Sequence, residues 1–297
     1  MRVAITGSSG LIGRALTANL IADGHEVLRL VRRTPAGPDE VQWDPTTGSL
    51  DPGALEGVGA IVNLAGAGVG DHRWTPAYKA EILDSRVNST RTIARAAAEM
   101  AIRPSVLVSA SAIGFYGDRG DAPVDETSSV GEGFLANVCV QWEAAADPAR
   151  EAGIRVAHPR TGLVVSRHGG AWEKLIKLFK LGVGGRMGSG NQYWSFISMR
   201  DEIRALRFLI DNPQLSGAVN LTAPEPVTNR QAVRDLADTL HRPAALPVPS
   251  FALKLALGEF STEVLGSGRV LPRVLEQADF RWQDPTMSEA VRSALAE

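Results

Sequence analysis

Residues 1–33 read MRVAITGSSGLIGRALTANLIADGHEVLRLVRR, and this stretch decides the fold. Residues 2–6 form a short apolar run typical of a buried parallel strand, and residues 11–21 carry apolar side chains at helical spacing. A glycine-rich turn joins the two segments, and residues 27–31 form a second apolar run. This order predicts a strand, a tight turn, a helix and a second strand.

The turn has the sequence G-S-S-G-L-I-G, in which Gly7, Gly10 and Gly13 stand three apart. Without a Cβ, Gly7 permits a tight turn, Gly10 lets the backbone approach a ligand, and Gly13 lets the helix pack on the strand. The N-terminus of the helix offers unpaired N–H groups and a positive dipole end to phosphates. Between a strand and a helix, this pattern predicts a dinucleotide site. The residues expected to contact its pyrophosphate are Gly7, Ser9, Gly10, Leu11, Ile12 and Gly13.

Two arginines, Arg32 and Arg33, follow the second strand. A site for NAD usually places Asp or Glu about twenty residues past the glycines, where the carboxylate holds the ribose 2′-OH. Guanidinium groups at that position suit the 2′-phosphate of NADP instead, which they bind in a bidentate way. We therefore expect NADP(H) as the cofactor. The alternative is that one or both arginines are solvated surface charges.

The chain has 297 residues and a formal net charge of −2. Its length allows one large α/β domain, alone or with a smaller appendage. The balanced charge predicts neither nucleic acid nor a membrane as a partner, and favours a small-molecule substrate. Met1 leads directly into a strand and no apolar run is long enough to span a bilayer, so we expect a cytoplasmic protein without a signal peptide.

Cysteine and histidine residues give no sign of a disulfide or a metal site. Cys139 is the only cysteine, which excludes an intrachain disulfide and suits a reducing cytosol. His158 and His168 show no metal-binding spacing with the other histidines, and we expect no metal.

The rest of the chain alternates between strand and helix patterns. Strands are expected near residues 41–43, 59–64, 104–109, 154–165, 193–197 and 218–221. Helices are expected at residues 74–101, in one or two pieces, and at 134–151, 171–181 and 200–211. This alternation predicts an α/β fold with a Rossmann-type, doubly wound parallel sheet.

The proline-rich stretch 243–249 marks the one plausible domain boundary. Residues 1–242 are expected to form the NADP-binding domain, with substrate-pocket segments interleaved at about 166–200. Residues 243–297 are expected to form a small, mostly helical segment on the substrate side.

Ligands of open α/β sheets lie beyond the carboxyl ends of the strands. The sequence therefore places Ser111 in a functional contact at such a strand end. Further residues expected beside the cofactor, on strand exits or on the helix at 74–101, are Leu64, Ala65, Gly66, Glu81, Arg86, Ser109, Arg160 and Gly162.

Several motifs resemble the extended short-chain dehydrogenase/reductase superfamily. They are T-G-S-S-G-L-I-G, N-L-A-G, S-A-S-A-I-G-F-Y-G, P-R-T-G-L-V-V and G-S-G-N-Q-Y-W-S-F-I-S-M-R-D. More narrowly, the chain resembles the atypical epimerase-like branch, whose members also carry an older label as relatives of a cell-division inhibitor. The resemblance covers nearly the whole chain. It implies an NAD(P)-type Rossmann domain, a substrate pocket built by later segments, and a homodimer formed through paired helices.

The superfamily's catalytic set is a Ser, a Tyr-x-x-x-Lys pair and an Asn, and this chain departs from it. None of its three tyrosines is followed four residues later by lysine. Counting back from W-E-A-A-A places Leu135 at the Tyr position and Cys139 at the Lys position. Arg86 takes the Asn position, whereas Ser111 (or Ser109) is retained.

Moving a hydride to or from a carbon that bears oxygen also requires a proton transfer, and Leu135 has no proton to give. Three routes stay open: Cys139 as thiol or thiolate, Tyr116, or water held by Ser111. Arg86 could stabilise an oxyanion or contact the cofactor phosphates.

Each of these candidates also has a structural interpretation. Cys139 would be a small buried hydrophobe, and Tyr116 would pack its ring. Arg86 would form a helical ion pair with Glu81 or Asp84.

Two functions remain. In the first, the chain is an NADP(H)-dependent oxidoreductase or epimerase acting on a small polar molecule, by resemblance a nucleotide-linked sugar. In the second, it is a non-catalytic NADP(H)-binding regulator, to which the cell-division label would fit. The retained Ser111 favours the enzyme, and we take it as the working hypothesis.

Overall fold

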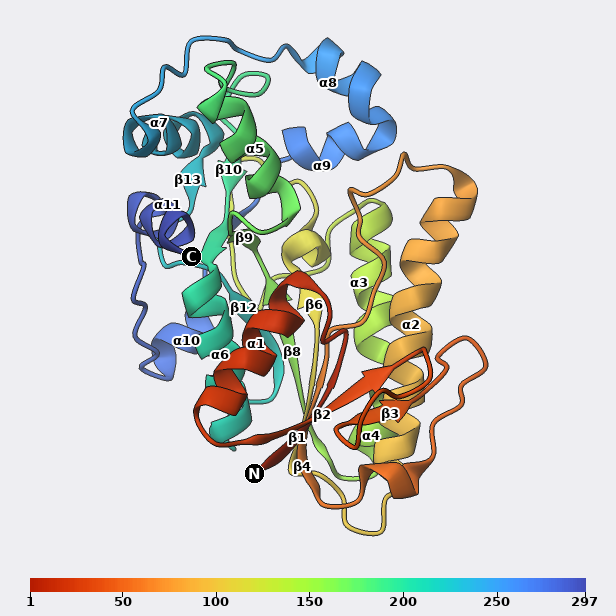
Figure 1. Cartoon of the computed structure of the whole chain (residues 1–297). Coiled ribbons are helices and arrows are strands. Elements are labelled where there is room, and N and C mark those ends of the chain that lie inside the picture. The colour runs from red at the N-terminus through yellow and green to blue at the C-terminus, as the bar shows by residue number, and fades with distance from the viewer.

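The computed structural model describes residues 1–297 and is built around a parallel β-sheet (Figure 1). The strands lie in the order β12-β8-β5-β4-β1-β2-β3, and a short strand, β6, pairs with β8. The order reverses between β1 and β4, which is where sheets of this kind hold ligands. The predicted doubly wound, Rossmann-type sheet is confirmed. Its strands are β1 (Arg2–Thr6), β2 (Glu26–Val31), β3 (Glu40–Gln42), β4 (Val58–Asn63), β5 (Val106–Ser109), β6 (Ser111–Ala112), β8 (Arg155–Thr161) and β12 (Gly217–Leu221).

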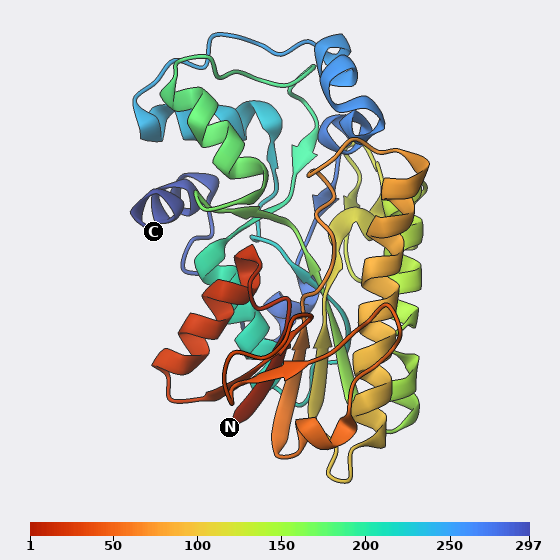
Figure 2. The same ribbon diagram turned by 45° about the vertical axis from the view of Figure 1, so that its right-hand side comes forward.

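Helices cover both faces of the sheet (Figure 2). Because side chains alternate along a strand, Val3 and Ile5 of β1 pack in one core cluster and Ala4 packs in another. The first cluster lies under α1 (Leu11–Ala22) and α6 (Met199–Asp211). The second lies under α2 (Pro76–Glu99) and α4 (Asp147–Glu151), and α3 (Phe134–Ala144) packs beside α2.

A second lobe, which we call the upper lobe, lies above the carboxyl edge of the sheet in Figure 1. Its own core contains Trp172, Phe179, Phe196, Leu236 and Val291. The lobe is formed by α5 (Gly170–Lys180), α7 (Asn229–Leu240), α11 (Met287–Ala296) and the short strands β9 (Leu163–Val165), β10 (Tyr193–Trp194), β11 (Phe196–Ser198) and β13 (Val227–Thr228).

The residues from 243 onward are distributed over the molecule. They include α8 (Ser250–Leu257), α9 (Ser261–Leu265), α10 (Arg273–Gln277) and α11. The strand β14 (Arg269–Val270) pairs with β7 (Pro123–Val124), and α11 packs on α7. The model contains no helix that is both long and apolar enough to cross a membrane.

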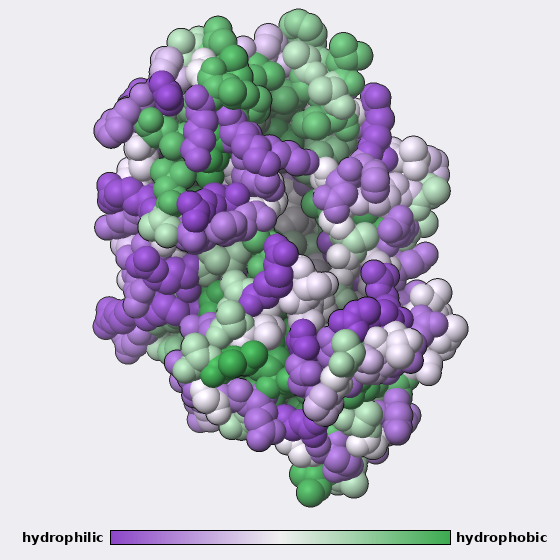
Figure 3. Space-filling view, in the orientation of Figure 1, coloured by the Kyte–Doolittle hydropathy of each residue, from purple (hydrophilic) through white to green (hydrophobic).

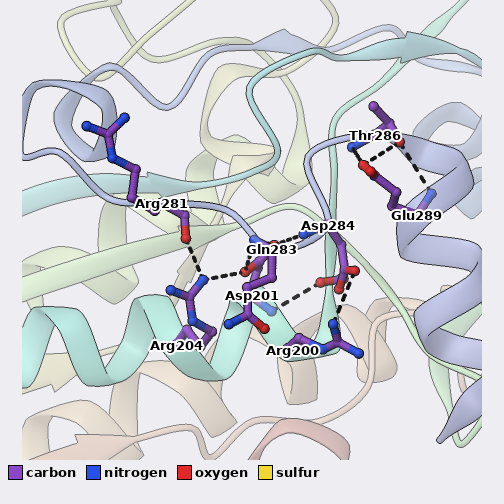
Figure 4. Close-up of polar contacts among 9 residues, drawn as sticks. Arg200, Asp201, Arg204, Arg281, Gln283, Asp284, Thr286 and Glu289 are labelled. Carbon is purple, nitrogen blue, oxygen red and sulfur yellow. Dashed lines mark hydrogen bonds and ion pairs between the residues drawn. The ribbon is translucent and has the colours of Figure 1, made fainter.

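The buried carboxylate of Asp201 attaches the C-terminal part of the chain to α6 (Figure 4). It accepts hydrogen bonds from the backbone N–H of Gln283 at 2.9 and 3.0 Å and of Asp284 at 2.8 Å. Arg204 Nη1 donates to the same carboxylate at 2.9 Å. The turn before α11 is thereby fixed to the helix that covers the sheet.

The sequence pattern placed most elements correctly but missed several breaks. Residues 76–99 form a single helix, which is one of the two alternatives expected there, whereas residues 134–151 form two helices separated near Ala145. Pro148 lies in the first turn of α4, where a proline is tolerated. In the interior of one continuous helix it would remove a backbone hydrogen bond and break the helix. The predicted strand at 154–165 is divided into β8 and β9, and α7 was not predicted.

Candidate functional site

The glycine turn is closely packed against the neighbouring strand exit. Gly7 has φ +65°, and a Cβ on it would lie 2.7 Å from the carbonyl of Leu64. A Cβ on Gly13 would lie 2.2 Å from the carbonyl oxygen of Gly7, to which Gly10 donates a backbone hydrogen bond at 2.9 Å. Gly10 caps α1 without a side-chain hydrogen bond, which leaves the first N–H groups of the helix available to a ligand. The turn thus fits a pyrophosphate at the helix N-terminus.

A groove of about 910 Å³ opens beyond the carboxyl ends of β1, β2 and β4. Some of the residues predicted to contact the cofactor line it, namely Gly7, Ser9, Gly10, Arg32, Arg33, Leu64, Ala65, Gly66 and Glu81. The other predicted contacts, which are not among its lining residues, are Leu11, Ile12, Gly13, Arg86, Ser109, Arg160 and Gly162. Figure 3 shows a hollow in the same face of the molecule, between the upper lobe and the side of α2.

A buried polar network supports the wall of this groove. The hydroxyl of Thr6 donates to Asn63 Oδ1 at 2.6 Å and accepts from the backbone N–H of Leu64 and Ala65 at 3.1 and 3.2 Å. Asn63 donates in turn to Thr90 at 2.8 Å and to Ser109 at 3.3 Å. The network fixes the backbone at 64–65 beside the glycine turn. Ser109 therefore acts inside the protein, behind the groove.

The two arginines after β2 have different surroundings. Arg33 forms a bidentate ion pair with Glu40, with both N–O distances at 2.7 Å, and Arg29 lies 3.3 Å from the same carboxylate. The hydrogen bonds from Arg33 hold the pKa of Glu40 at about 2. Arg32 has no carboxylate within 4.0 Å. Arg33 is thus already paired, and Arg32 is the guanidinium that remains free at this end of the groove.

A second polar network lies near the carboxyl ends of β5 and β8. Ser111 Oγ donates to Glu143 at 2.6 Å, and Arg160 donates to the two oxygens of Glu143 at 2.8 and 2.9 Å. Although burial raises it, the hydrogen bonds and charge of Arg160 lower the pKa of Glu143 below its ordinary value. Glu143 is therefore ionised at neutral pH and accepts a hydrogen bond from the Ser111 hydroxyl.

Tyr116 belongs to the same network and is fully buried. Its hydroxyl accepts from Arg160 Nη1 at 3.0 Å and donates to Asn220 Oδ1 at 2.8 Å. Arg160 is engaged with Tyr116 and Glu143, and neither Tyr116 nor Arg160 is among the residues that line the groove. The hydrogen bonds favour the packing interpretation of Tyr116, while the cofactor contact expected for Arg160 and the proton transfer considered for Tyr116 stay predictions.

Leu135 and Cys139, which the resemblance places at the superfamily's Tyr and Lys positions, lie in an apolar contact. Leu135 and the Cys139 Sγ both lie beside Gly114, where a Cβ would be 3.3 Å from Leu135 Cβ and 4.0 Å from the sulfur. Cys139 donates to the carbonyl of Ala112 at 3.6 Å, and burial raises the pKa of its thiol to about 11. At neutral pH Cys139 is a buried thiol, which favours the packing interpretation.

Arg86 lies behind Gly66, which lines the groove. A Cβ added at Gly66 would lie 3.2 Å from the Arg86 side chain. Its guanidinium stacks over Trp142 at 5.0 Å and donates to the carbonyl of Ile82 at 3.0 Å. The helical ion pairs with Glu81 or Asp84 are absent, since neither carboxylate is within 4.0 Å. Arg86 is therefore a half-buried cation beside the groove.

Gly162 has a packing role at the exit of β8. A Cβ at this position would lie 2.8 Å from the carbonyl oxygen of Ser195. Its small size lets β9 run close to β11.

Sequence reasoning missed the functions of Asn63, Trp142 and Asn220. Asn63 could have been noticed as a polar residue that ends an apolar strand. Glu143 is the acidic residue of the W-E-A-A-A motif, and in the structure it is the centre of a network with Ser111 and Arg160. Asn220 gave no signal, because its partner Tyr116 lies 104 residues away.

A parallel sheet with a glycine turn at its switch point and a groove beyond its strand ends defines a Rossmann-type dinucleotide-binding protein. Residues 3–221 match the model of the NAD dependent epimerase/dehydratase family, and residues 248–294 match a domain of unknown function, DUF1731. The chain belongs to the NAD dependent epimerase/dehydratase family, and the resemblance noted in the sequence is confirmed.

Known proteins of this family match the whole chain. Epimerase family protein Mb2239 of Mycobacterium bovis is 48% identical over 290 residues, which cover 97% of this chain and 96% of the relative. Human epimerase family protein SDR39U1 (isoform 2), solved with NADPH, has a TM-score of 0.91 at 30% identity and 100% coverage of both chains. A nucleoside-diphosphate sugar epimerase from Corynebacterium glutamicum has a TM-score of 0.83 at 38% identity, and this chain spans 58% of it.

Proposed function

We propose that the chain is an NADP(H)-dependent oxidoreductase or epimerase acting on a small polar molecule that resembles a nucleotide-linked sugar. The observation that supports NADP(H) as the cofactor is the free guanidinium of Arg32, which lies at the end of β2 and lines the groove. Glu40, the carboxylate nearest that strand end, is neutralised by Arg33 and Arg29. The NADPH in the human relative and the sugar-nucleotide activity named for the Corynebacterium relative support the proposal.

The packing of the glycine turn supports the cofactor assignment independently of the relatives. Any side chain at Gly13 would meet the backbone of Gly7, so the turn tolerates only a glycine and leaves its surface to a ligand. Arg32 is placed to bind the 2′-phosphate, while Arg33 braces Glu40 and the strand end. We infer that Arg32 carries most of the preference for NADP(H) over NAD(H).

When bound, the dinucleotide supplies or accepts a hydride at its nicotinamide ring. The chain's own contribution is the Ser111–Glu143 pair. Glu143 orients the Ser111 hydroxyl, and Arg160 keeps the carboxylate ionised and fixed. We infer that Ser111 holds the reacting oxygen of the substrate, or a water beside it, in place of the missing Tyr. Arg86, which stacks over Trp142 and contacts Gly66, adds positive charge beside the groove.

Binding measurements test the cofactor assignment. Trp43 lines the groove, so quenching of intrinsic fluorescence reports binding of NADPH and NADH. Arg32→Ala should weaken NADPH binding by about tenfold to a hundredfold, which is the range for one charged hydrogen-bonded contact, and should leave NADH binding unchanged. Arg91→Ala, an exposed arginine on α2, is the matched control and should bind as the native protein does. Equal affinity of the native protein for both dinucleotides would refute the assignment.

Single-turnover experiments separate the enzyme from a non-catalytic NADP(H)-binding regulator. Bound NADPH is mixed with a panel of carbonyl compounds that includes nucleotide-linked keto sugars, and its oxidation is followed by absorbance. An enzyme should oxidise NADPH with at least one compound, and Ser111→Ala should slow that step without changing NADPH affinity. Tight binding without oxidation by any compound would favour the non-catalytic regulator, to which the older cell-division label would fit.

A further inference from the structure

Large exposed hydrophobic side chains gather at one end of the upper lobe. Of the eleven in the molecule, six lie on or near α5 and α8, at Leu178, Leu181, Val183, Leu246, Phe251 and Leu255. In Figure 3 hydrophobic atoms accordingly collect at the top of the view, above the ends of these two helices. We call these six residues, together with Lys177, Lys180 and Lys254, the apical face. Exposed apolar side chains gathered in this way are typical of an interaction site.

Backbone hydrogen bonds hold the two parts of the apical face together. The segment after α5 runs beside the segment before α8, because Leu246 N donates to Gly184 O at 3.3 Å and Val248 N donates to Arg186 O at 2.8 Å. Gly188 N donates back to Val248 O at 2.9 Å. Residues more than sixty positions apart therefore share one surface, and no single stretch of the sequence shows it.

Lysines are concentrated on these same helices. The chain has five lysines, and four of them are Lys174, Lys177 and Lys180 on α5 and Lys254 on α8. Lys177 pairs with Glu173, whereas Lys180 and Lys254 have no carboxylate within 4.0 Å. On α8, Lys254 shares one helix face with Phe251 and Leu255, which are 72% and 76% exposed. Positive charge and exposed apolar side chains thus occur together on α5 and α8.

A basic hollow lies directly beside the apical face. It has a volume of about 460 Å³, and the linker residues Ala244, Ala245 and Pro247 form part of its wall. Its charged lining consists of one acid, Asp238, and four arginines, namely Arg186, Arg230, Arg234 and Arg242. None of these arginines has a carboxylate within 4.0 Å. The hollow extends the positive charge of the apical face along the linker.

We propose that the apical face docks on an anionic lipid bilayer, with the apolar side chains at the level of the acyl boundary and the lysines and arginines among the headgroups. This combination of exposed apolar and cationic groups is what interfacial helices use, and each lysine near an anionic surface is worth about fivefold in affinity. A second copy of the chain fits less well, because a two-fold contact would oppose the same lysines. The inference is independent of the proposed enzymatic function. It revises the expectation from overall charge, since the fold gathers charges that the sequence disperses.

Co-sedimentation with vesicles tests the proposal. The full chain should sediment with phosphatidylcholine vesicles that contain phosphatidylserine, should bind pure phosphatidylcholine much less, and should be released by salt. The double variant Phe251→Ser with Leu255→Ser should lose at least about tenfold in binding, because two apolar side chains no longer insert. Lys180→Gln with Lys254→Gln should lose more on anionic than on neutral vesicles. Ile102→Ser, at a side chain that is 75% exposed elsewhere, is the matched control and should bind as the native protein does.

Three results would overturn the proposal. They are no sedimentation with anionic vesicles, equal binding to both kinds of vesicle, and unchanged binding by the serine double variant. The alternative result is a native chain that fails to bind vesicles and sediments as a dimer in ultracentrifugation, with the serine double variant monomeric. That result would identify the apical face as a self-association surface. All substituted side chains are exposed, and unfolding temperatures equal to that of the native protein verify that the variants are folded.

Discussion

Replacement of Glu202 by glutamine tests whether one buried carboxyl group controls how the stability of this protein depends on pH. Glu202 lies on α6 and is fully buried. Its Oε1 accepts a hydrogen bond from the Thr161 hydroxyl at 2.9 Å, whereas its Oε2 has no partner. Burial raises the pKa of Glu202 from 4.5 to about 8, because a single hydrogen bond does not compensate for the loss of solvent.

The direction and size of the effect follow from this pKa. Between pH 4.5 and about 8 the native state retains a proton on Glu202 that the unfolded chain releases. Its contribution to stability is therefore complete below pH 4.5 and is lost as the pH rises through about 8. The shift corresponds to about 5 kcal/mol of unfolding free energy, as an upper figure. Glutamine keeps the shape and an acceptor for Thr161 but cannot ionise.

Urea unfolding from about pH 5 to about pH 9 measures the difference. Glu202→Gln should match the native protein, or be slightly less stable, at the acid end, and should be more stable by several kcal/mol at the alkaline end. Glu99→Gln, at an exposed position on α2, should follow the native curve throughout. A constant difference between Glu202→Gln and the native protein across the pH range would show that Glu202 has an ordinary pKa, and the reasoning would fail.

Three further substitutions test the glycine turn, the attachment of the C-terminal turn to α6, and the role of the buried thiol. Gly13→Ala should abolish measurable NADPH binding in a fluorescence titration, because its Cβ would lie 2.2 Å from the Gly7 oxygen; native-like binding would contradict the geometry. Asp201→Asn should lower the unfolding free energy by about 3 kcal/mol, since the carboxylate accepts two backbone N–H groups and Arg204, whereas the exposed Asp279→Asn should change little in the same denaturation assay. Cys139→Ala should leave NADPH binding within about twofold of native and cost about 1 kcal/mol of stability; loss of a reaction that the native protein catalyses would restore the thiol as a catalytic group.

Local patterns explain what the sequence could predict. The strand, glycine turn and helix of residues 1–33 depend on neighbours in the chain, so the fold class and part of the groove wall follow from periodicity and glycine spacing. The exit residues Ala65 and Gly66 could be placed because the carboxyl ends of parallel strands meet at one edge.

Contacts through space explain what the sequence could not predict. The pairing of Arg33 with Glu40 depends on β3 lying beside β2, which no pattern near the arginines indicates. The network around Glu143 joins helix and strand residues whose register is set only by the packed sheet. The burial of Tyr116 and of Cys139 likewise depends on the segments that cover them, so neither residue could be distinguished from a catalytic group in advance.

The participation of α11 in the core of the upper lobe has a consequence for synthesis. The sheet is complete once β12 (Gly217–Leu221) has left the ribosome, but the lobe built on residues 163–240 still lacks the apolar side of α11. Until Met287, Ala290, Val291 and Ala294 emerge, that lobe exposes aromatic surface to solvent and to chaperones. The core under α1 and α6 likewise includes Leu275 and Phe280, so neither half of the molecule can complete its packing until the C-terminal residues have been synthesised.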